Sequence, residues 1–465
     1  MDKKIKIIDI ESIKKDINLI NFMGNELFIT KQLNNYYLLS RICPHMGGLI
    51  RQEKNKLFCP LHNYYYSKDG KCDKSTVNAN SIKLILEEQY LVAEAKDLHK
   101  LELKNNFPRN KNSKKLDISK VQDIPKINLH SHATLEFNFK NMNILFDPWL
   151  DGPAMLGSWR QYPKPIIGGS DLNPDFIIIT HQHSDHFHLP TLKAIGRDKL
   201  IIFPDFKNGR IASFLKQNNF TNFKALDFEE RFQLSSKSFI TFYRPNSLFL
   251  DSIAFLEKDS FRFLNLNDAG LNPKIADKIG PVHLLASVFS SGASGYPLCW
   301  EHLCKDQKNE IMIKACKGKL EMLLQSISMY QADFIMPIAS HLKLWLEEHS
   351  NYRKSIINNN INDVIKFFEL NTKTQNLIPL IPGDSYELAS NTFLNRKYEK
   401  GIIYNKEYVE KQLRKDRQEF KGSLISWGYF NLEYNRKKVL KHFEEDLDAA
   451  YLNTEEEVYL LITIY

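Results

Sequence analysis

Four side chains that commonly bind metal stand together directly after one apolar segment. Residues 177–180 are mostly β-branched and apolar and are bounded by prolines, which predicts a buried strand. The strand is followed by His181, His183, Asp185 and His186. Three imidazoles and a carboxylate this close together waste hydrogen-bonding capacity unless a cation joins them, and zinc and non-haem iron accept these ligands. We therefore expect a metal site here, the alternative being a solvated His-rich loop.

A second group of ligand residues lies in the first hundred residues. Cys43 and His45 form a C-x-H pair, and Cys59 and His62 form a C-x-x-H pair. These two pairs are the ligand set of a Rieske [2Fe–2S] cluster, in which two histidines replace two cysteines on one iron. A hairpin across residues 53–56 is expected to bring the two pairs together. A tetrahedral Cys₂His₂ zinc site is the alternative, and the glycines at 47–48 favour the cluster because they permit close backbone approach.

Length and composition set the class of the chain. At 465 residues it exceeds one ordinary core, and 43% hydrophobic residues are typical of a globular protein. No apolar run approaches membrane-spanning length, and no signal peptide is recognisable, so we expect no membrane insertion. The net charge of +8 comes without an aromatic-interleaved basic motif, so no nucleic-acid partner is expected. Six cysteines do not make a disulfide framework, which indicates a reducing, cytoplasmic location.

The pattern changes along the chain predict a multidomain protein. Residues 1–104 contain short strands with turn signals and form an all-β Rieske domain. Residues 105–125 are rich in Lys and Asn and form a linker. Residues 126–395 alternate strands and helices, as in an αβ/βα sandwich, and residues 396–465 form a mainly helical, charged extension.

Three further residues are candidates for the metal site. Asp268 follows an apolar strand at 261–267, the alternative being a turn or capping residue. His341 ends another apolar strand and is a candidate ligand. His132 stands before a strand, where proteins of the metallo-β-lactamase fold, which the 181–186 pattern resembles, place a histidine that lines the site; the alternative is a structural, hydrogen-bonded histidine.

The H-x-H-x-D-H pattern at 181–186 is the metal signature of the metallo-β-lactamase fold. Together with the preceding Rieske pairs and linker, it resembles the CMP-N-acetylneuraminate hydroxylase family. The matching segments are residues 146–154, 180–186, 264–268, 292–297 and 381–384, and the resemblance covers roughly residues 20–395. It implies hydroxylation of the N-acetyl group of a CMP-linked sialic acid with O₂, and electrons from cytochrome b5 or an equivalent donor such as ferredoxin with its reductase.

The chain departs from the family pattern at three places. A histidine expected after the mid-domain strand is missing from residues 243–247, so one ligand is lost or replaced. His341 stands where the family has another residue and is a candidate replacement. Val288 occupies the position of an acid. These departures leave open the substrate, an anionic N-acyl or nucleotide sugar by resemblance.

The combination of the two predicted centres favours oxygenation over hydrolysis. A Rieske cluster transfers single electrons, and a His/carboxylate iron site binds O₂ but needs those electrons. A hydrolase uses zinc to activate water and needs no cluster. We therefore predict a monooxygenase with a [2Fe–2S] cluster and one or two non-haem irons, zinc being the alternative metal.

The predicted site residues follow from this assignment. Asp185, Asp268 and His132 are the predicted catalytic residues. The cluster is expected on Cys43, His45, Cys59 and His62, and the iron on His181, His183, Asp185, His186, Asp268 and His341. The predicted substrate contacts are Gly292, Ala293, Ser294, Gly295 and Tyr296. Two other functions stay open: a phosphodiesterase- or lactonase-type hydrolase with the cluster as redox sensor, and a non-catalytic electron-transfer protein.

Overall fold

The computed structural model describes residues 4–426 except 102, 104–115, 117, 156, 246, 248, 292–296, 372–375 and 398–399. The predicted substrate contacts at 292–296 and most of the predicted linker therefore lie outside the described residues. The chain forms two compact units, Met1–Asn405 and Lys406–Tyr465. Beyond residue 396, the described segments are the helices α7 (Lys400–Ile403) and α8 (Lys406–Ser426), in keeping with the predicted helical extension.

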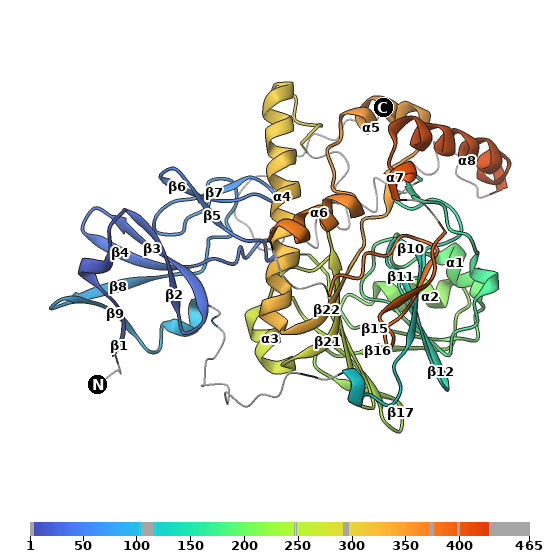
Figure 1. Ribbon diagram of the computed structural model, residues 1–465, viewed down its shortest axis with the longest axis horizontal. Coiled ribbons are helices and arrows are strands. Elements are labelled where there is room, and N and C mark those ends of the chain that lie inside the picture. Colours follow the sequence, from blue (N-terminus) through green and yellow to red (C-terminus); the bar gives the residue numbers. More distant parts are fainter. Residues whose placement is uncertain are drawn as a thin grey trace. The chain divides into compact units, whose positions relative to one another are not determined.

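An antiparallel sheet forms the body of the N-terminal domain (Figure 1). Its strand order is β1-β9-β8-β4-β3-β2. The strands are β1 (Lys4–Asp9), β2 (Ile17–Phe22), β3 (Asn25–Gln32), β4 (Asn35–Ser40), β8 (Ser81–Glu87) and β9 (Tyr90–Glu94), with 3₁₀ turns η1 (Ile10–Ser12), η2 (Leu98–Leu101) and η3 (Ile118–Lys120). Alternate apolar residues such as Leu27, Ile29 and Leu38 pack into one core beneath the sheet.

A small three-stranded sheet carries the candidate cluster residues. It consists of β5 (Arg51–Glu53), β6 (Lys56–Cys59) and β7 (Tyr64–Tyr66). Glu53 pairs with Lys56 across a two-residue turn in which Lys54 has a φ of 54°, so the expected hairpin is present. Cys59 ends β6, and the loop that follows it carries His62.

The second part of the first unit is built on two large mixed sheets. One has the order β16-β15-β14-β12-β11-β10-β24-β25 and the other β17-β18-β19-β20-β21-β22. Rings from facing strands interleave between them: Phe263 of the second sheet lies 4.6 Å from Phe137 and 5.5 Å from Phe146 of the first, measured between centroids. The structure thus confirms the predicted sandwich beside an all-β domain.

The strands of the first large sheet are β10 (Lys126–Ser131), β11 (Thr134–Phe139), β12 (Met142–Phe146), β14 (Phe176–Ile178), β15 (Leu200–Pro204), β16 (Phe223–Leu226), β24 (Asp384–Glu387) and β25 (Thr392–Asn395). Those of the second are β17 (Arg231–Ser235), β18 (Ser238–Tyr243), β19 (Ile253–Lys258), β20 (Phe261–Asn267), β21 (Val282–Val288) and β22 (Ala332–Ile338), and β13 (Trp159–Gln161) pairs with β23 (Leu342–Leu344). The remaining elements are α1 (Leu189–Ile195), α2 (Arg210–Gln217), α3 (Pro273–Ile279), α4 (Lys305–Tyr330), α5 (Ser350–Ser355), α6 (Ile361–Asn371), η4 (Gly169–Asp171) and η5 (Glu347–His349).

Strand ends position the candidate metal residues. Residues 181–186 follow β14, and α1 then leads to the parallel strand β15. Asp268 follows β20 directly, and His132 follows β10. Two sheets thus direct the candidate side chains from their strand ends toward one region.

Helix α4 is shared by the sandwich and the small sheet of the N-terminal domain (Figure 1). It packs against β21 and β22. On the other side, Lys314 Nζ donates to Glu53 Oε2 at 2.9 Å, and Glu321 forms an ion pair with Arg51. Among the helices that the structure describes, none is both long and apolar enough to cross a membrane.

Candidate functional site

The two Cys/His pairs converge in the N-terminal domain. His45 Nδ1 and His62 Nδ1 are 3.0 Å apart, and Cys43 and Cys59 are each 1% exposed. A hydrogen bond between the two sulfur atoms lowers the pKa of Cys43 to about 7 and raises that of Cys59. Two sulfurs and two facing imidazole nitrogens in one buried place are the donor set that a Rieske cluster requires, so the residues present fit this group.

Two neighbouring residues complete the cluster pocket. The Tyr66 hydroxyl lies 3.1 Å from Cys43 Sγ, and burial raises the pKa of Tyr66, so the hydroxyl keeps its proton as a donor. A Cβ on Gly48 would lie 3.0 Å from Cys59 Sγ and 2.6 Å from Leu61 Cδ1. This glycine is therefore needed for close packing around the sulfur atom, as its sequence position suggested.

The candidate metal residues form three overlapping groups of three. These are His132, Asp185 and His186; His181, His183 and Asp251; and His181, His186 and Asp268. Within each group, one ligand atom from each residue lies within 4.8 Å of the others. Each group has two histidines and one carboxylate, the ligand type of non-haem iron oxygenases.

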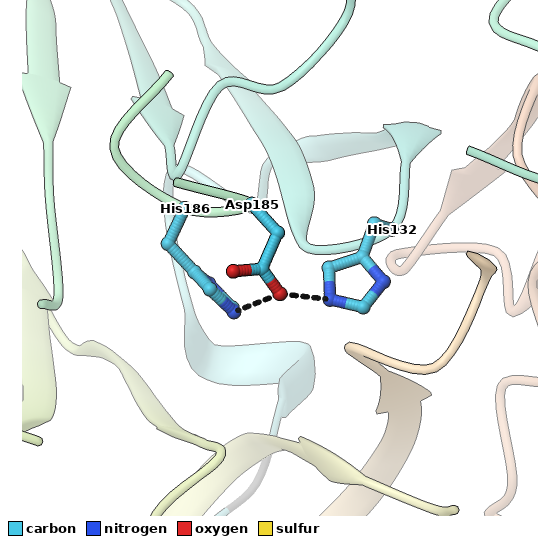
Figure 2. Close-up of side chains that lie close together, drawn as sticks. All are labelled: His132, Asp185 and His186. Carbon is cyan, nitrogen blue, oxygen red and sulfur yellow. Dashed lines mark ion pairs between the residues drawn. The ribbon is translucent and has the colours of Figure 1, made fainter. Parts of the chain in front are cut away.

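Carboxylates join these groups into one cluster of side chains. Asp185 Oδ2 lies between two imidazoles, 3.4 Å from His132 Nε2 and 3.5 Å from His186 Nε2 (Figure 2). Asp268 Oδ2 is 3.3 Å from His186 Nε2 and 3.9 Å from His181 Nε2. Asp268 therefore stands between His181 and His186, within reach of both imidazoles.

Buried charge and unpaired oxygens indicate that these groups fit a cation. The buried atoms Asp185 Oδ1 and Asp251 Oδ1 accept no hydrogen bond from the described residues, at a cost of about 1–3 kcal/mol each. Burial and the neighbouring Asp268 raise the pKa of Asp251 to about 6. Burial and the neighbouring His186 hold the pKa of His181 well below its usual value, so this imidazole is neutral, the form that binds metal.

Asp147 fixes the orientation of one histidine from behind. It accepts hydrogen bonds from Thr180 N at 2.8 Å, Thr180 Oγ1 at 2.7 Å and the amide of Asn267, and lies 3.1 Å from His186 Nδ1. Asp147 and Asn267 have φ values of 44° and 48°, which turn both side chains inward at their strand ends. A carboxylate behind a metal-binding imidazole sets its tautomer and leaves Nε2 for the metal.

The cluster pocket and the metal residues border the same cavity, of about 250 Å³. His62, Leu61 and Met46 line it from the N-terminal domain. The metal side contributes His132, His183, Asp185, Asp251 and Asp268, and apolar side chains such as Trp159 and Phe249 complete the wall together with Lys319.

The structure brings most of the predicted site residues together but not His341. Ala339, with a φ of 55°, lines the cavity in that part of the wall, and the His341 ring packs 5.3 Å from that of Phe289. His341 belongs to none of the three groups among the described residues, and Asp251 stands with His181 and His183 in its place. In the described residues, an acid from the segment between β18 and β19 thus completes the group that contains His183.

Three residues of the site were not predicted from the sequence. Asp251 lies in the irregular segment between β18 and β19, where no periodicity marks it. Its only sequence signal is an acid two residues before a strand begins. Lys319 and Asn267 are recognisable only from the packing of α4 and from the end of β20.

Comparison with known proteins identifies the two kinds of domain. Residues 3–94 match the model of the Rieske [2Fe-2S] domain, and residues 126–265 match that of the beta-lactamase superfamily domain. Cytidine monophosphate-N-acetylneuraminic acid hydroxylase from Macaca mulatta is 24% identical over 419 residues, covering 85% of this chain and 69% of the relative. The Mus musculus protein of the same name is 24% identical over 418 residues, covering 85% and 70%.

The chain is thus similar, over most of its length, to two cytidine monophosphate-N-acetylneuraminic acid hydroxylases. The two domain models confirm the predicted Rieske and lactamase-like domains. The hydroxylases to which the chain is similar support the predicted oxidoreductase class. Among solved structures, a possible metal-dependent hydrolase from Veillonella parvula aligns with a TM-score of 0.42 and 12% identity, over 57% of this chain and 100% of that one. The diiron β-hydroxylase CmlA from Streptomyces venezuelae aligns with a TM-score of 0.36 and 17% identity, over 54% and 50%.

Proposed function

We propose that this protein is a Rieske-fed non-haem iron monooxygenase that hydroxylates the N-acetyl group of a CMP-linked sialic acid or a related N-acyl sugar. One observation carries the proposal: His62 of the cluster pocket and Asp251 and Asp268 of the metal site border one cavity. A substrate in that cavity is next to both centres. The names of the relatives supply the substrate class.

Two separate sets of residues would hold the two cofactors. Cys43, His45, Cys59 and His62 would hold the cluster, and the three His/carboxylate groups would hold one or two irons. When bound, the cluster supplies single electrons and the iron binds and activates O₂. The electrons come from an external one-electron donor such as cytochrome b5 or a ferredoxin with its reductase.

The protein side chains prepare the cavity for this chemistry. Trp159, Phe249 and Leu61 keep part of the wall apolar, which limits competing water. Asp147 holds His186 in one orientation through Nδ1. His132, between Asp185 and the ring of Trp149, is fixed by packing at 5.4 Å between ring centroids.

The ligand set and the cavity favour oxygenation over hydrolysis. A zinc hydrolase activates water and has no use for an electron carrier in the wall of its substrate cavity. Two histidines with one carboxylate are typical of non-haem iron oxygenases.

The first test combines metal analysis with spectroscopy and turnover. Anaerobically purified protein is expected to contain iron beyond the two atoms of the cluster and, after dithionite reduction, to show a rhombic Rieske EPR signal. With CMP-N-acetylneuraminate, an electron donor and isotopically labelled O₂, we expect one labelled oxygen in the N-acyl group by mass spectrometry.

Two variants make this test specific. Cys59→Ser is expected to lose both the EPR signal and turnover, while Cys299→Ser, at an exposed thiol, keeps both. Zinc without a Rieske signal, or phosphodiester or lactone hydrolysis without a reductant, contradicts the proposal.

A further inference from the structure

Lys319 is a buried cation in the wall between the two candidate centres. It lies within α4, is 7% exposed, and borders the same cavity as His62, Asp251 and Asp268. Lysine is rarely buried unless a charged group requires it. Neither the cluster pocket nor the metal groups include Lys319 among their candidate ligands.

Packing of α4 against the cluster loop fixes this position. A Cβ on Gly318 would lie 2.8 Å from Pro60 Cγ, so the helix is in close contact with the loop between Cys59 and His62. Lys319 is the next residue of the same helix. The helix is held further by Lys314 and Glu321, which pair with Glu53 and Arg51 of the small sheet.

The charge of Lys319 acts on both sides of the wall. Burial lowers the pKa of its ammonium group, against the attraction of Asp268, Cys59 and Asp251. Within the described part of the chain, no hydrogen bond or ion pair joins Lys319 Nζ to another side chain. Its influence is therefore through space, where burial lengthens the range of a charge.

We propose that Lys319 is a positioning residue whose single positive charge is shared by the two centres: it favours the reduced state of the Rieske cluster and opposes cation binding at the metal site. The inference rests on the cluster and the metal site of the proposed function, but not on the substrate. Reduction adds one electron, and so one negative charge, to the cluster, and a nearby buried cation stabilises that charge. The same cation repels a divalent metal held by Asp251 and Asp268.

Replacing Lys319 by an uncharged residue is therefore expected to change two quantities, the reduction potential of the cluster and the affinity of the metal site. Lys319→Met removes the charge and keeps most of the side-chain volume. The cluster potential is expected to shift to a lower value, because the reduced state loses stabilisation. Metal affinity is expected to rise several-fold, because the metal site loses a repelling charge. Loss of packing alone does not produce this pair of shifts.

The experiment measures both quantities on the full chain with its cluster. The potential is followed by EPR during a redox titration, and the affinity of the metal site by competition of Zn²⁺ with a chromophoric chelator. Lys319→Arg retains the charge and is expected to stay near the wild type. Lys317→Met, at an exposed lysine on the same helix, is the matched control and is expected to shift neither quantity.

Several results would overturn the inference. An unchanged potential in Lys319→Met, or equal shifts in Lys319→Met and Lys317→Met, would do so. A raised substrate KM with an unchanged potential would also do so and would make Lys319 an anchor for an anionic group. If Lys319→Met does not fold, Lys319→Gln tests the same loss of charge. A wild-type chain without hydroxylase activity contradicts the proposed function, and the two shifts can still be measured in it.

Discussion

Asp251 adds a carboxylate to the group formed by His181 and His183. With His181 and His183 it gives that half of the site two imidazole donors and one carboxylate. The carboxylate charge partly neutralises a divalent cation. A carboxylate oxygen also suits iron better than it suits a metal that prefers thiolate ligands. Ser252 Oγ donates to Thr180 O at 2.6 Å and ties this loop to the end of β14, which holds Asp251 near the histidines.

We expect Asp251→Asn to lose iron from the metal site while the cluster remains. The amide keeps the size of the side chain but removes the charge, and affinity is expected to fall by more than roughly tenfold, since loss of outer-shell partners alone costs about that much. Iron per chain and the EPR signal of the reduced cluster measure the two sites separately. Asp198→Asn, at an exposed acid, serves as the control. Full iron content in Asp251→Asn would remove Asp251 from the ligand set.

Contiguity in the sequence decides which of these residues could be predicted. His181, His183, Asp185 and His186 stand within six positions, so their pattern is recognisable before any folding is considered. Asp251 and Lys319 reach the site from distant segments, and each is a common residue type in a setting without periodicity. His341 was expected at the site because it ends an apolar strand; its ring packs against Phe289, and among the described residues it joins none of the three groups.

At the scale of elements, the cluster loop and the segment after β20 are in backbone contact. A Cβ on Gly270 would lie 1.9 Å from Met46 O, and Leu271 N donates to Gly47 O at 3.2 Å. Gly270 is two residues from Asp268. The first cluster loop therefore packs against the chain segment that carries a candidate metal ligand.

Gly270→Ala is expected to force these two segments apart. The added methyl group meets backbone, which cannot rotate away, and overpacking of this kind costs about 1–3 kcal/mol of unfolding free energy. Denaturant unfolding measures this loss, and slower oxidation of the reduced cluster by O₂ would report the weakened contact between the sites. Gly401→Ala, where a Cβ meets no atom within 4 Å, is the control. Equal stability of the two variants would show that the close contact does not exist in solution.

The elements themselves were predictable where one face of a strand is buried. The strand at 4–9 and the hairpin across 53–56 follow from alternation and turn residues, and both are present. The 26-residue helix α4 is absent from the predicted elements. It packs on β21 and β22 with one side and meets the cluster loop with another, so no simple polar face marks it, and its buried Lys319 interrupts the apolar pattern.

At the scale of the whole molecule, two separate ligand sets share one wall, which links their occupancy. When both groups are bound, an electron on the cluster would place a negative charge near the metal site, and a metal cation would in turn stabilise the reduced cluster. Because binding linkage is reciprocal, the two effects have the same size. The protein is therefore expected to respond to metal and to reductant as one unit.

This linkage predicts that the metal site binds Zn²⁺, which does not change oxidation state, more tightly in the dithionite-reduced protein than in the oxidised protein. An increase of about fivefold or more corresponds to the lower end of usual coupling energies. Anaerobic competition with a chromophoric chelator measures both affinities. In Cys59→Ser, which is expected to lack the cluster, dithionite should have no effect on Zn²⁺ affinity. Equal Zn²⁺ affinities in the oxidised and reduced wild type would contradict this prediction. The two centres would then border one cavity without any energetic coupling between them.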